Sequence, residues 1–189
     1  MATTANGWPV IFDNRTTGPQ PRLRKWMVPA GNGLRSGERY FYLRDGAIGF
    51  VLMHFILWFH ETIERLDETA IWDEWGWAVR PIRGQSSGYS NHAGGAAADV
   101  NATLHPRGVA VAKTFSSAEI KKIRVWVASK KYLGVLRWGG DWSTPDGMHI
   151  EIAPVRPRRV KRVARMLMKT SRGKRILDAN PYAKKVILS

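Results

Sequence analysis

Two histidines of this chain lie near carboxylates in glycine-rich or turn-rich sequence. His92 and Asp99 enclose a run of alanine and glycine, and His149 follows Asp146 by three residues. A catalytic zinc takes three ligands from His, Asp and Glu and keeps a fourth position open for water or substrate. His92, Asp99 and His149 supply that set, and the small residues between the first two let both approach one ion. A single histidine beside such a turn is more often structural, so the prediction depends on the whole set.

Two further carboxylates compete for the role of general base, which a zinc hydrolase needs as well as its metal. Asp146 can reach a metal-activated water from the turn that precedes His149. Glu151 shares a strand face with His149, because alternate strand residues point the same way. It is therefore either the base or a hydrogen-bond acceptor for that ligand. Asp141 is interpreted as a turn residue or a substrate contact.

The types of metal-binding side chain in the sequence limit which metal sites are possible. The chain has no cysteine, so a thiolate site, a cysteine nucleophile and a disulfide framework are excluded. Any metal must therefore be bound through nitrogen and oxygen. His54, His60 and His105 have no neighbouring carboxylates of this kind and are interpreted as packing or surface residues.

Hydrophobic pattern and turn residues predict the elements that hold these side chains. The apolar run at 47–59 predicts a helix to about residue 66, buried at its start and solvated at its end, since it is too short to span a bilayer of ~30 Å. Ser116 and Glu119 have the spacing of a capping box, which predicts a helix over 117–132 ended by Gly134. Strands are predicted at 75–80, 95–100, 135–138 and 149–152, with 95–100 in the centre of a sheet.

This order predicts an α+β fold, in which a small antiparallel sheet flanked by helices carries the zinc site. A peptidase domain is expected over 1–155, with loops and short strands in its first 46 residues. Residues 156–189 hold twelve lysines and arginines and one acid, Asp178, together with an apolar stripe. They are predicted to form a basic helical segment, which either docks through its stripe with solvated charges or binds an anionic polymer.

The positive charge of the chain also allows a function other than hydrolysis. The net charge of +15 predicts attraction to nucleic acid, anionic lipid or anionic cell-wall polymer. A nucleic-acid-binding protein would use arginines on phosphates and exposed tryptophans on bases. Residues 1–14 lack the features of a secretory signal.

Two blocks of the sequence resemble a known family. Ser90, His92, Gly95, Ala97 and Asp99 fit the pattern S-x-H-x-x-G-x-A-x-D, and Trp138-Gly-Gly-Asp-Trp142 is followed by Asp146-x-x-His149. Over about residues 75–152 the chain is similar to the zinc D-alanyl-D-alanine carboxypeptidase and L-alanyl-D-glutamate endopeptidase family, especially its phage endolysin members.

The resemblance implies zinc on His92, Asp99 and His149, with Asp146 as the base. It also implies an arginine that stabilises the developing oxyanion. Arg80, in Val79-Arg80-Pro81, is the first choice and Arg83 the second. Ser90 would orient a ligand or the substrate, and the substrate-binding residues would include Arg83, Asp141 and Trp142.

The function implied is hydrolysis of an amide in the peptidoglycan stem peptide. For a phage-like chain without a signal sequence we expect the L-Ala–D-Glu bond, and D-Ala–D-Ala carboxypeptidase activity is the alternative. The expected enzyme contains Zn²⁺, is a monomer, and stays in the host cytoplasm until lysis releases it to the cell wall. Its partner is peptidoglycan, with an anionic polymer or lipid for the basic segment and no nucleic acid.

Overall fold

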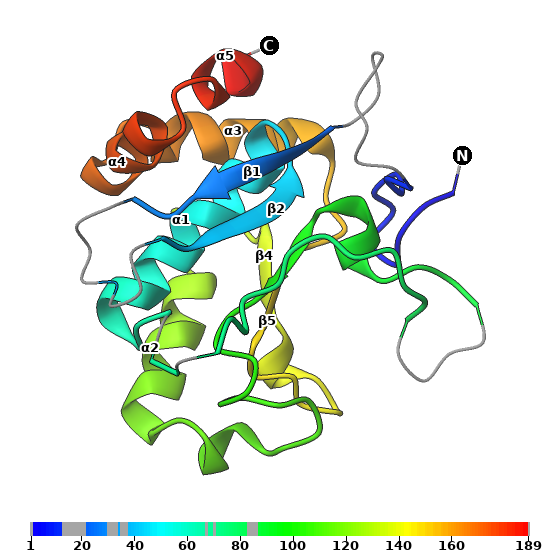
Figure 1. The fold of residues 1–189 in the computed structure, drawn as a ribbon, viewed down its shortest axis with the longest axis vertical. Helices are drawn as coiled ribbons and strands as arrows, with labels where there is room; N and C mark the ends of the chain where they lie inside the picture. The colour runs from blue at the N-terminus through cyan, green and yellow to red at the C-terminus, as the bar shows by residue number, and fades with distance from the viewer. Residues whose placement is uncertain are drawn as a thin grey trace.

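A computed structural model describes residues 2–12, 22–29, 34, 38–66, 68–69, 71–82 and 87–188. These residues form an α+β fold with two small antiparallel sheets and surrounding helices (Figure 1), as predicted. The strands are β1 (Leu23–Met27), β2 (Tyr40–Arg44), β3 (Ala97–Asp99), β4 (Leu136–Trp138) and β5 (His149–Ile152). The α-helices are α1 (Ala47–Thr62), α2 (Ser117–Val127), α3 (Pro157–Leu167), α4 (Ser171–Ala179) and α5 (Ala183–Leu188). Short 3₁₀ helices are η1 (Asn91–Gly94), η2 (Val111–Lys113) and η3 (Gly139–Asp141).

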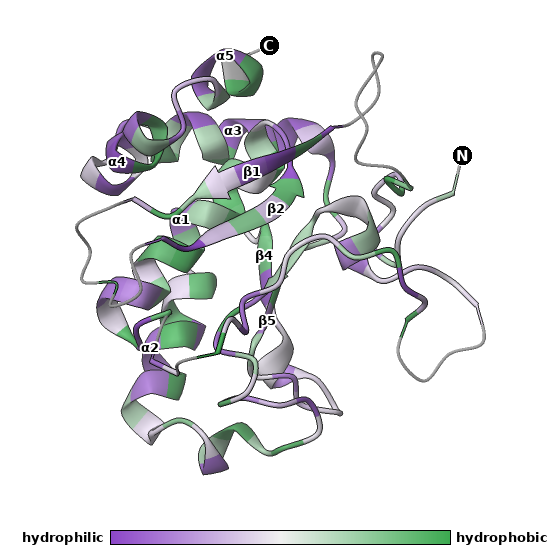
Figure 2. Cartoon of the chain, viewed as in Figure 1, coloured by the Kyte–Doolittle hydropathy of each residue, from purple (hydrophilic) through white to green (hydrophobic). Residues whose placement is uncertain are grey.

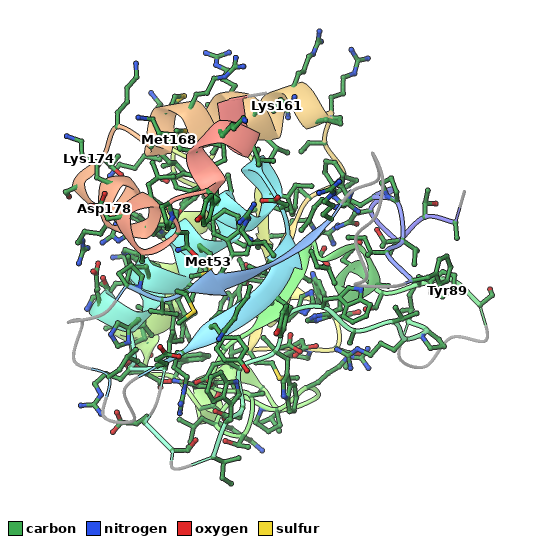
Figure 3. The ribbon with its side chains drawn as sticks, turned by 45° about the horizontal axis from the view of Figure 1, so that its top comes forward. Met53, Tyr89, Lys161, Met168, Lys174 and Asp178 are labelled. Atoms are coloured by element: carbon green, nitrogen blue, oxygen red, sulfur yellow. The ribbon has the colours of Figure 1, made fainter. Side chains whose placement is uncertain are left out.

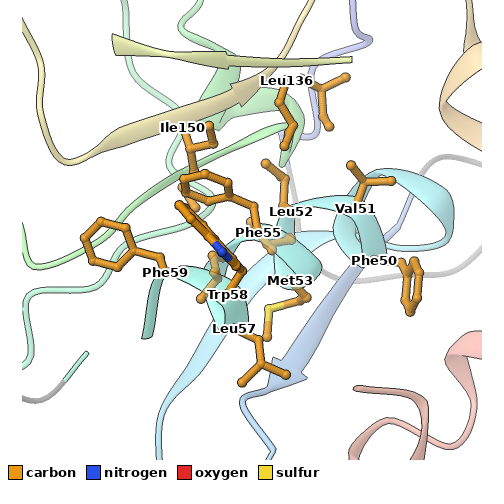
Figure 4. Packing of buried hydrophobic residues seen from close by; sticks show 14 of the residues in the cluster. Phe50, Val51, Leu52, Met53, Phe55, Leu57, Trp58, Phe59, Leu136 and Ile150 are labelled. Carbon is orange, nitrogen blue, oxygen red and sulfur yellow. The ribbon is translucent and has the colours of Figure 1, made fainter. Parts of the chain in front are cut away.

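Helix α1 is the centre of the core. It is apolar on all sides, and a helix of that kind must be covered on all sides. It contacts the β1–β2 hairpin, β5 and the helices α3, α4 and α5. In Figure 4 Leu52 and Phe55 lie on the side of α1 that faces Leu136 and Ile150, and Leu57 points the opposite way. The predicted helix thus exists but ends at residue 62. It is buried as far as His60, and the predicted solvated end is limited to Glu61 and Thr62.

The three-stranded sheet has the order β3-β5-β4, so β5 is its central strand. The expectation that 95–100 would be central is wrong. The antiparallel register pairs Asp99 with His149. It therefore places the last residue of β3 beside the first residue of β5.

The predicted strand at 75–80 is not formed. Trp75 makes an isolated bridge with Asp99, but the backbone amides of Trp77 and Ala78 donate to Tyr42 and His92 respectively. With the Ser90 amide donating to the Arg80 carbonyl, the backbone hydrogen bonds of this segment are divided among four partners, which prevents a continuous ladder with any one of them.

Helix α2 begins at the predicted capping box. The Ser116 hydroxyl accepts from the Glu119 amide at 3.3 Å, and the Glu119 carboxylate accepts from the Ser116 amide at 2.8 Å. The helix ends at residue 127 rather than 132. Leu133 and Gly134 follow with left-handed φ angles of 49° and 69°, so the chain turns into β4 there.

Residues 157–188 form three helices instead of one. The Thr170 hydroxyl accepts from the Gly173 amide at 3.0 Å and so caps a new helix, and Asn180-Pro181 separates α4 from α5. Their apolar sides join the core around α1, with Val160, Val163 and Ile176 buried in it. Figure 2 shows hydrophilic and hydrophobic residues mixed along these helices. The division of the chain at residue 155 stays a prediction, and both parts contribute to one core.

Candidate metal centre

Three buried side chains converge at the β3–β5 pair. The Nε2 atom of His92 lies 3.2 Å from Asp99 Oδ1, and His149 Nδ1 lies 2.9 Å from the same oxygen. The two ring nitrogens are 3.2 Å apart. Zinc bonds of about 2.0–2.1 Å at tetrahedral angles separate ligand atoms by about 3.3 Å. The triangle therefore fits one face of such a tetrahedron, and these residues could hold a metal ion.

Local backbone geometry brings the triangle together. Strand register supplies Asp99 and His149, while His92 comes from η1. Ser90 is the N-cap of η1, and its hydroxyl accepts from the His92 amide at 3.2 Å. Gly95 ends η1 with a left-handed φ of 60°, and a Cβ there would lie 2.5 Å from the Arg44 amide nitrogen. Glycine is thus required between His92 and Asp99.

The second nitrogen of each imidazole has an acceptor. His92 Nδ1 lies against the Gly76 carbonyl, and His149 Nε2 is 3.1 Å from Glu151 Oε2. Donation of a ring N–H to these acceptors leaves the lone pairs of His92 Nε2 and His149 Nδ1 pointing into the triangle. Metal-binding histidines are usually oriented by such a bond.

The carboxylate of Glu151 is fully engaged. Asn91 donates to Oε2 at 2.6 Å, Asn6 donates to Oε1 at 2.8 Å, and Arg137 lies 3.6 Å from Oε1. Burial alone would raise the pKa of Glu151, but hydrogen bonds and the charge of His149 outweigh it and lower the pKa. This arrangement favours the acceptor interpretation over that of base. Sequence reasoning missed Asn6 and Asn91, because neither has a pattern that points to a residue so distant in the chain.

The carboxylate of Asp146 differs from that of Glu151 in its hydrogen bonding. Its Oδ1 atom is buried and has no hydrogen-bond partner among the described residues. Burial raises the pKa of this carboxyl, with Asp99 adding to the effect and His149 and Arg107 opposing it. A carboxylate with one unengaged oxygen and a raised pKa beside a metal-binding group has the properties of a general base.

The charge of the triangle is balanced within it. Burial opposes ionisation of Asp99, but His92 and His149 overcome it and lower the pKa of the carboxyl. Burial likewise disfavours a charged His149, but Asp99 and Glu151 raise its pKa to about 10. A metal ion bound at this site would have to displace the second ring proton of the charged His149.

A pocket of about 120 Å³ opens beside His92 and His149, and its lining includes Arg80, Ser90, Arg107, Trp142 and Asp146. Arg80 Nη2 lies 3.6 Å from Asp99 Oδ2, and the side chain is 37% exposed. The Trp142 ring is 5.0 Å from that of His149.

Arg107 was not predicted. It approaches Asp146 with Nε 3.8 Å from Oδ2. Its position between Pro106 and Gly108 carries no sequence signal for this role. The described lining of the pocket therefore contains two arginines, Arg80 beside Asp99 and Arg107 beside Asp146.

Other predicted positions lie elsewhere. Asp141 is outside the pocket lining and pairs with Arg124 at 2.8 Å on the surface. Arg83 lies outside the described residues. His54, His60 and His105 are buried away from the triangle, as packing residues should be. His54 contacts the Tyr132 hydroxyl at 2.9 Å, and His105 contacts Glu64 at 2.7 Å.

The site lies within a segment that has a family likeness. Residues 83–152 match the D-alanyl-D-alanine carboxypeptidase family. The matched segment contains His92, Asp99, Asp146 and His149. It supports a metallopeptidase that acts on peptidoglycan, and the typical metal of that family is zinc. No curated protein and no solved structure matches the chain.

Among the described residues, none of the helices combines the length and the apolar character that crossing a bilayer requires.

Proposed function

We propose that the chain is a zinc-dependent peptidoglycan peptidase of the endolysin type, which hydrolyses the L-Ala–D-Glu amide of the stem peptide. The observation that carries the proposal is the convergence of His92, Asp99 and His149 beside a buried Asp146 whose Oδ1 has no hydrogen-bond partner among the described residues. Such an enzyme would act as a monomer, remain in the host cytoplasm until lysis, and then reach the cell wall.

Zinc bound by the three ligands would supply Lewis acidity and lower the pKa of water. The chain's own residues would do the rest. Asp146 takes the proton of the attacking water at Oδ1 and returns it to the leaving amine. Glu151 keeps the proton of His149 on Nε2, so that Nδ1 stays available as a ligand.

The arginines would act on charge. Arg80 lies at the edge of the triangle, where its guanidinium can stabilise negative charge that develops on the scissile carbonyl oxygen. Arg107 holds Asp146 from the other side of the carboxylate and opposes its protonation. Trp142 and Ser90 form part of the pocket wall, and Ser90 also positions His92 through its backbone.

Two measurements test the proposal. Elemental analysis should find about one zinc per chain, and mass spectrometry of digested muropeptides should find new L-Ala C-termini and D-Glu N-termini. A metal-free chain with no effect on purified peptidoglycan even after zinc addition would refute it.

The family description favours a second candidate, a D-Ala–D-Ala carboxypeptidase. Both activities would use the same metal centre and differ in the bond presented to it. The muropeptide experiment separates them, because a carboxypeptidase releases free D-alanine and leaves the L-Ala–D-Glu bond intact.

The nucleic-acid alternative is weakened by the placement of the tryptophans. All nine belong to the described residues, and of these only Trp72 and Trp75 are exposed. A surface that stacks successive bases needs several exposed aromatic rings along a basic groove. Tight, salt-sensitive DNA binding by a chain that contains no zinc would revive this alternative.

A further inference from the structure

The three C-terminal helices carry a layer of cations that the metal centre does not use. Of the twelve lysines and arginines at 156–185, ten are exposed and form no ion pair with any described carboxylate. They are Arg156, Arg158, Arg159, Lys161, Arg162, Arg165, Lys169, Lys174, Lys184 and Lys185. We call these ten residues the basic face. Figure 3 turns this layer toward the viewer, with Lys161 of α3 and Lys174 of α4 labelled.

The basic face is spatially ordered. Helix α3 is fixed on its apolar side, where Val160, Val163 and Leu167 are buried. Arg158, Arg162 and Arg165 therefore form a row along the outer side at i, i+4 and i+7, and Lys169 follows in the next turn. Docking of the apolar stripe thus leaves the charges pointing outward, as the first interpretation of this segment predicted, and binding to an anionic polymer stays a prediction.

A groove continues this face between α3, α4 and the start of α5. It has a volume of about 1020 Å³ and is lined by four cations, Arg165, Lys169, Lys174 and Lys184, by one acid, Asp178, and otherwise by apolar side chains. Its lining shares no residue with the pocket at the metal centre. In Figure 1 helices α3–α5 and the loop between β4 and β5, which carries Asp146, lie at opposite ends of the view.

Exposed apolar side chains lie among the cations. Met166 is 41% exposed and Tyr182 is 76% exposed. Met166 has Arg162 and Lys169 as its helical neighbours at i−4 and i+3. A soluble polyanion is bound by charge alone, whereas a lipid surface also accepts apolar and amphipathic side chains between its headgroups.

We propose that the basic face binds the surface of an anionic lipid bilayer, with Met166 and Tyr182 inserted among the headgroups. The cations contact lipid phosphates, and the groove receives an anionic headgroup over its apolar floor. Because the face and the pocket are separate, bound lipid leaves the metal centre accessible. This inference does not depend on the reaction catalysed there.

The test is sedimentation of the full chain with two kinds of vesicle, phosphatidylcholine alone and phosphatidylcholine mixed with an equal amount of phosphatidylglycerol. We expect binding to the mixed vesicles only, and weaker binding as salt is added. Each cation near an anionic surface contributes roughly a fivefold gain in partitioning. The variant Arg158→Glu, Arg162→Glu, Arg165→Glu, Lys169→Glu should therefore bind at least several-hundredfold more weakly.

A matched control separates the basic face from net charge. Lys113, Lys121, Lys122 and Lys130 are exposed on η2 and α2 and after it, and their replacement by Glu changes net charge by the same amount. The control should retain most of the binding. An equal loss in both variants would overturn the proposal, because attraction would then follow net charge rather than this face. Substitution of Arg158, Arg162, Arg165 and Lys169 by Gln gives a second variant, in which the net charge changes less than in the Glu variant. Circular dichroism verifies that each variant is folded.

The apolar side chains distinguish lipid from other polyanions. Met166→Ser with Tyr182→Ser should weaken vesicle binding severalfold and leave binding to soluble inorganic polyphosphate unchanged. If the double substitution affects neither, and polyphosphate binds as tightly as vesicles, the face recognises a soluble phosphate polymer and the lipid proposal is wrong.

Discussion

In the candidate metal centre most polar atoms lie against a specific neighbouring atom, whereas on the basic face ten cations have no partner among the described carboxylates. His92, His149 and Glu151 each have named partners, and Asp146 has one oxygen that is left unengaged. The cations of α3–α5 point outward on helices that are fixed by their apolar sides. The proposed function of the first region would therefore depend on individual atoms, and that of the second on summed charge. Single substitutions should have very different effects in the two regions.

The largest effect is expected from Asp99→Ala. The substitution removes one metal ligand and the oxygen that both histidines share. Zinc content should fall from about one per chain to near zero, and peptidoglycan hydrolysis by on the order of a thousandfold or more. Elemental analysis and a turbidity assay on purified cell walls measure the two.

Asp141→Ala is the matched control for this loss. It removes the same chemical group from η3, where the carboxylate is exposed and pairs with Arg124 outside the pocket. Zinc content and activity should stay close to those of the parent chain. A variant at residue 99 that retained stoichiometric zinc would show that the triangle is not the metal site.

The next largest effects are expected at Asp146 and Glu151, the two carboxylates beside the proposed metal ligands. Asp146→Asn should reduce the turnover rate by about 10²–10⁴-fold while zinc stays bound, because only the base is lost. Glu151→Gln should instead weaken zinc affinity by about 10–100-fold, and activity should return when zinc is in excess. Zinc titrations followed by rates at saturating metal distinguish these outcomes. The reverse pattern would exchange the two roles.

A smaller effect is expected in the pH profile. Asp146 must be ionised to accept a proton, so activity should be lost as pH falls through its pKa. Burial raises that pKa, which places the acid limb above the range of an ordinary carboxyl, and Arg107 opposes the rise. Arg107→Gln should therefore move the acid limb to higher pH. Rates measured across pH at constant zinc loading test this, and a limb that stayed in place would separate Arg107 from the base.

The sequence predicted elements whose signals are local. The capping box of Ser116 and Glu119 correctly predicted the start of α2, and the apolar run at 47–59 predicted α1. The pattern around His92, Asp99 and His149 predicted which side chains converge. The breaks in the basic segment were also readable, since Thr170 can cap a helix and Pro181 ends one, but the continuous stripe of charge concealed them.

Contacts between distant residues could not be predicted in the same way. The hairpin β1–β2 lies in the first 46 residues, and its buried Trp26, Phe41 and Leu43 pack on α1. Short strands joined by a long connection leave little periodicity to read. Asn6 reaches Glu151 across 145 residues, and the segment 75–80 divides its backbone hydrogen bonds among four partners. Tertiary packing decides all of these.

The smallest effect is expected from a single substitution on the basic face. Arg162→Gln removes one of ten similar cations, so vesicle binding should fall only about fivefold, and the free energy of unfolding should change by less than about 0.5 kcal/mol. Val163→Ala, one residue further along α3, should do the opposite. It removes a fully buried side chain from the contact with α1, which should cost roughly 1–3 kcal/mol of stability and leave lipid binding of the folded chain unchanged. Denaturant unfolding and vesicle sedimentation measured on both variants would reveal whether stability and binding are divided between the two faces of this helix. A large loss of binding from Arg162→Gln alone would mean that the face contains a specific site rather than a summed charge.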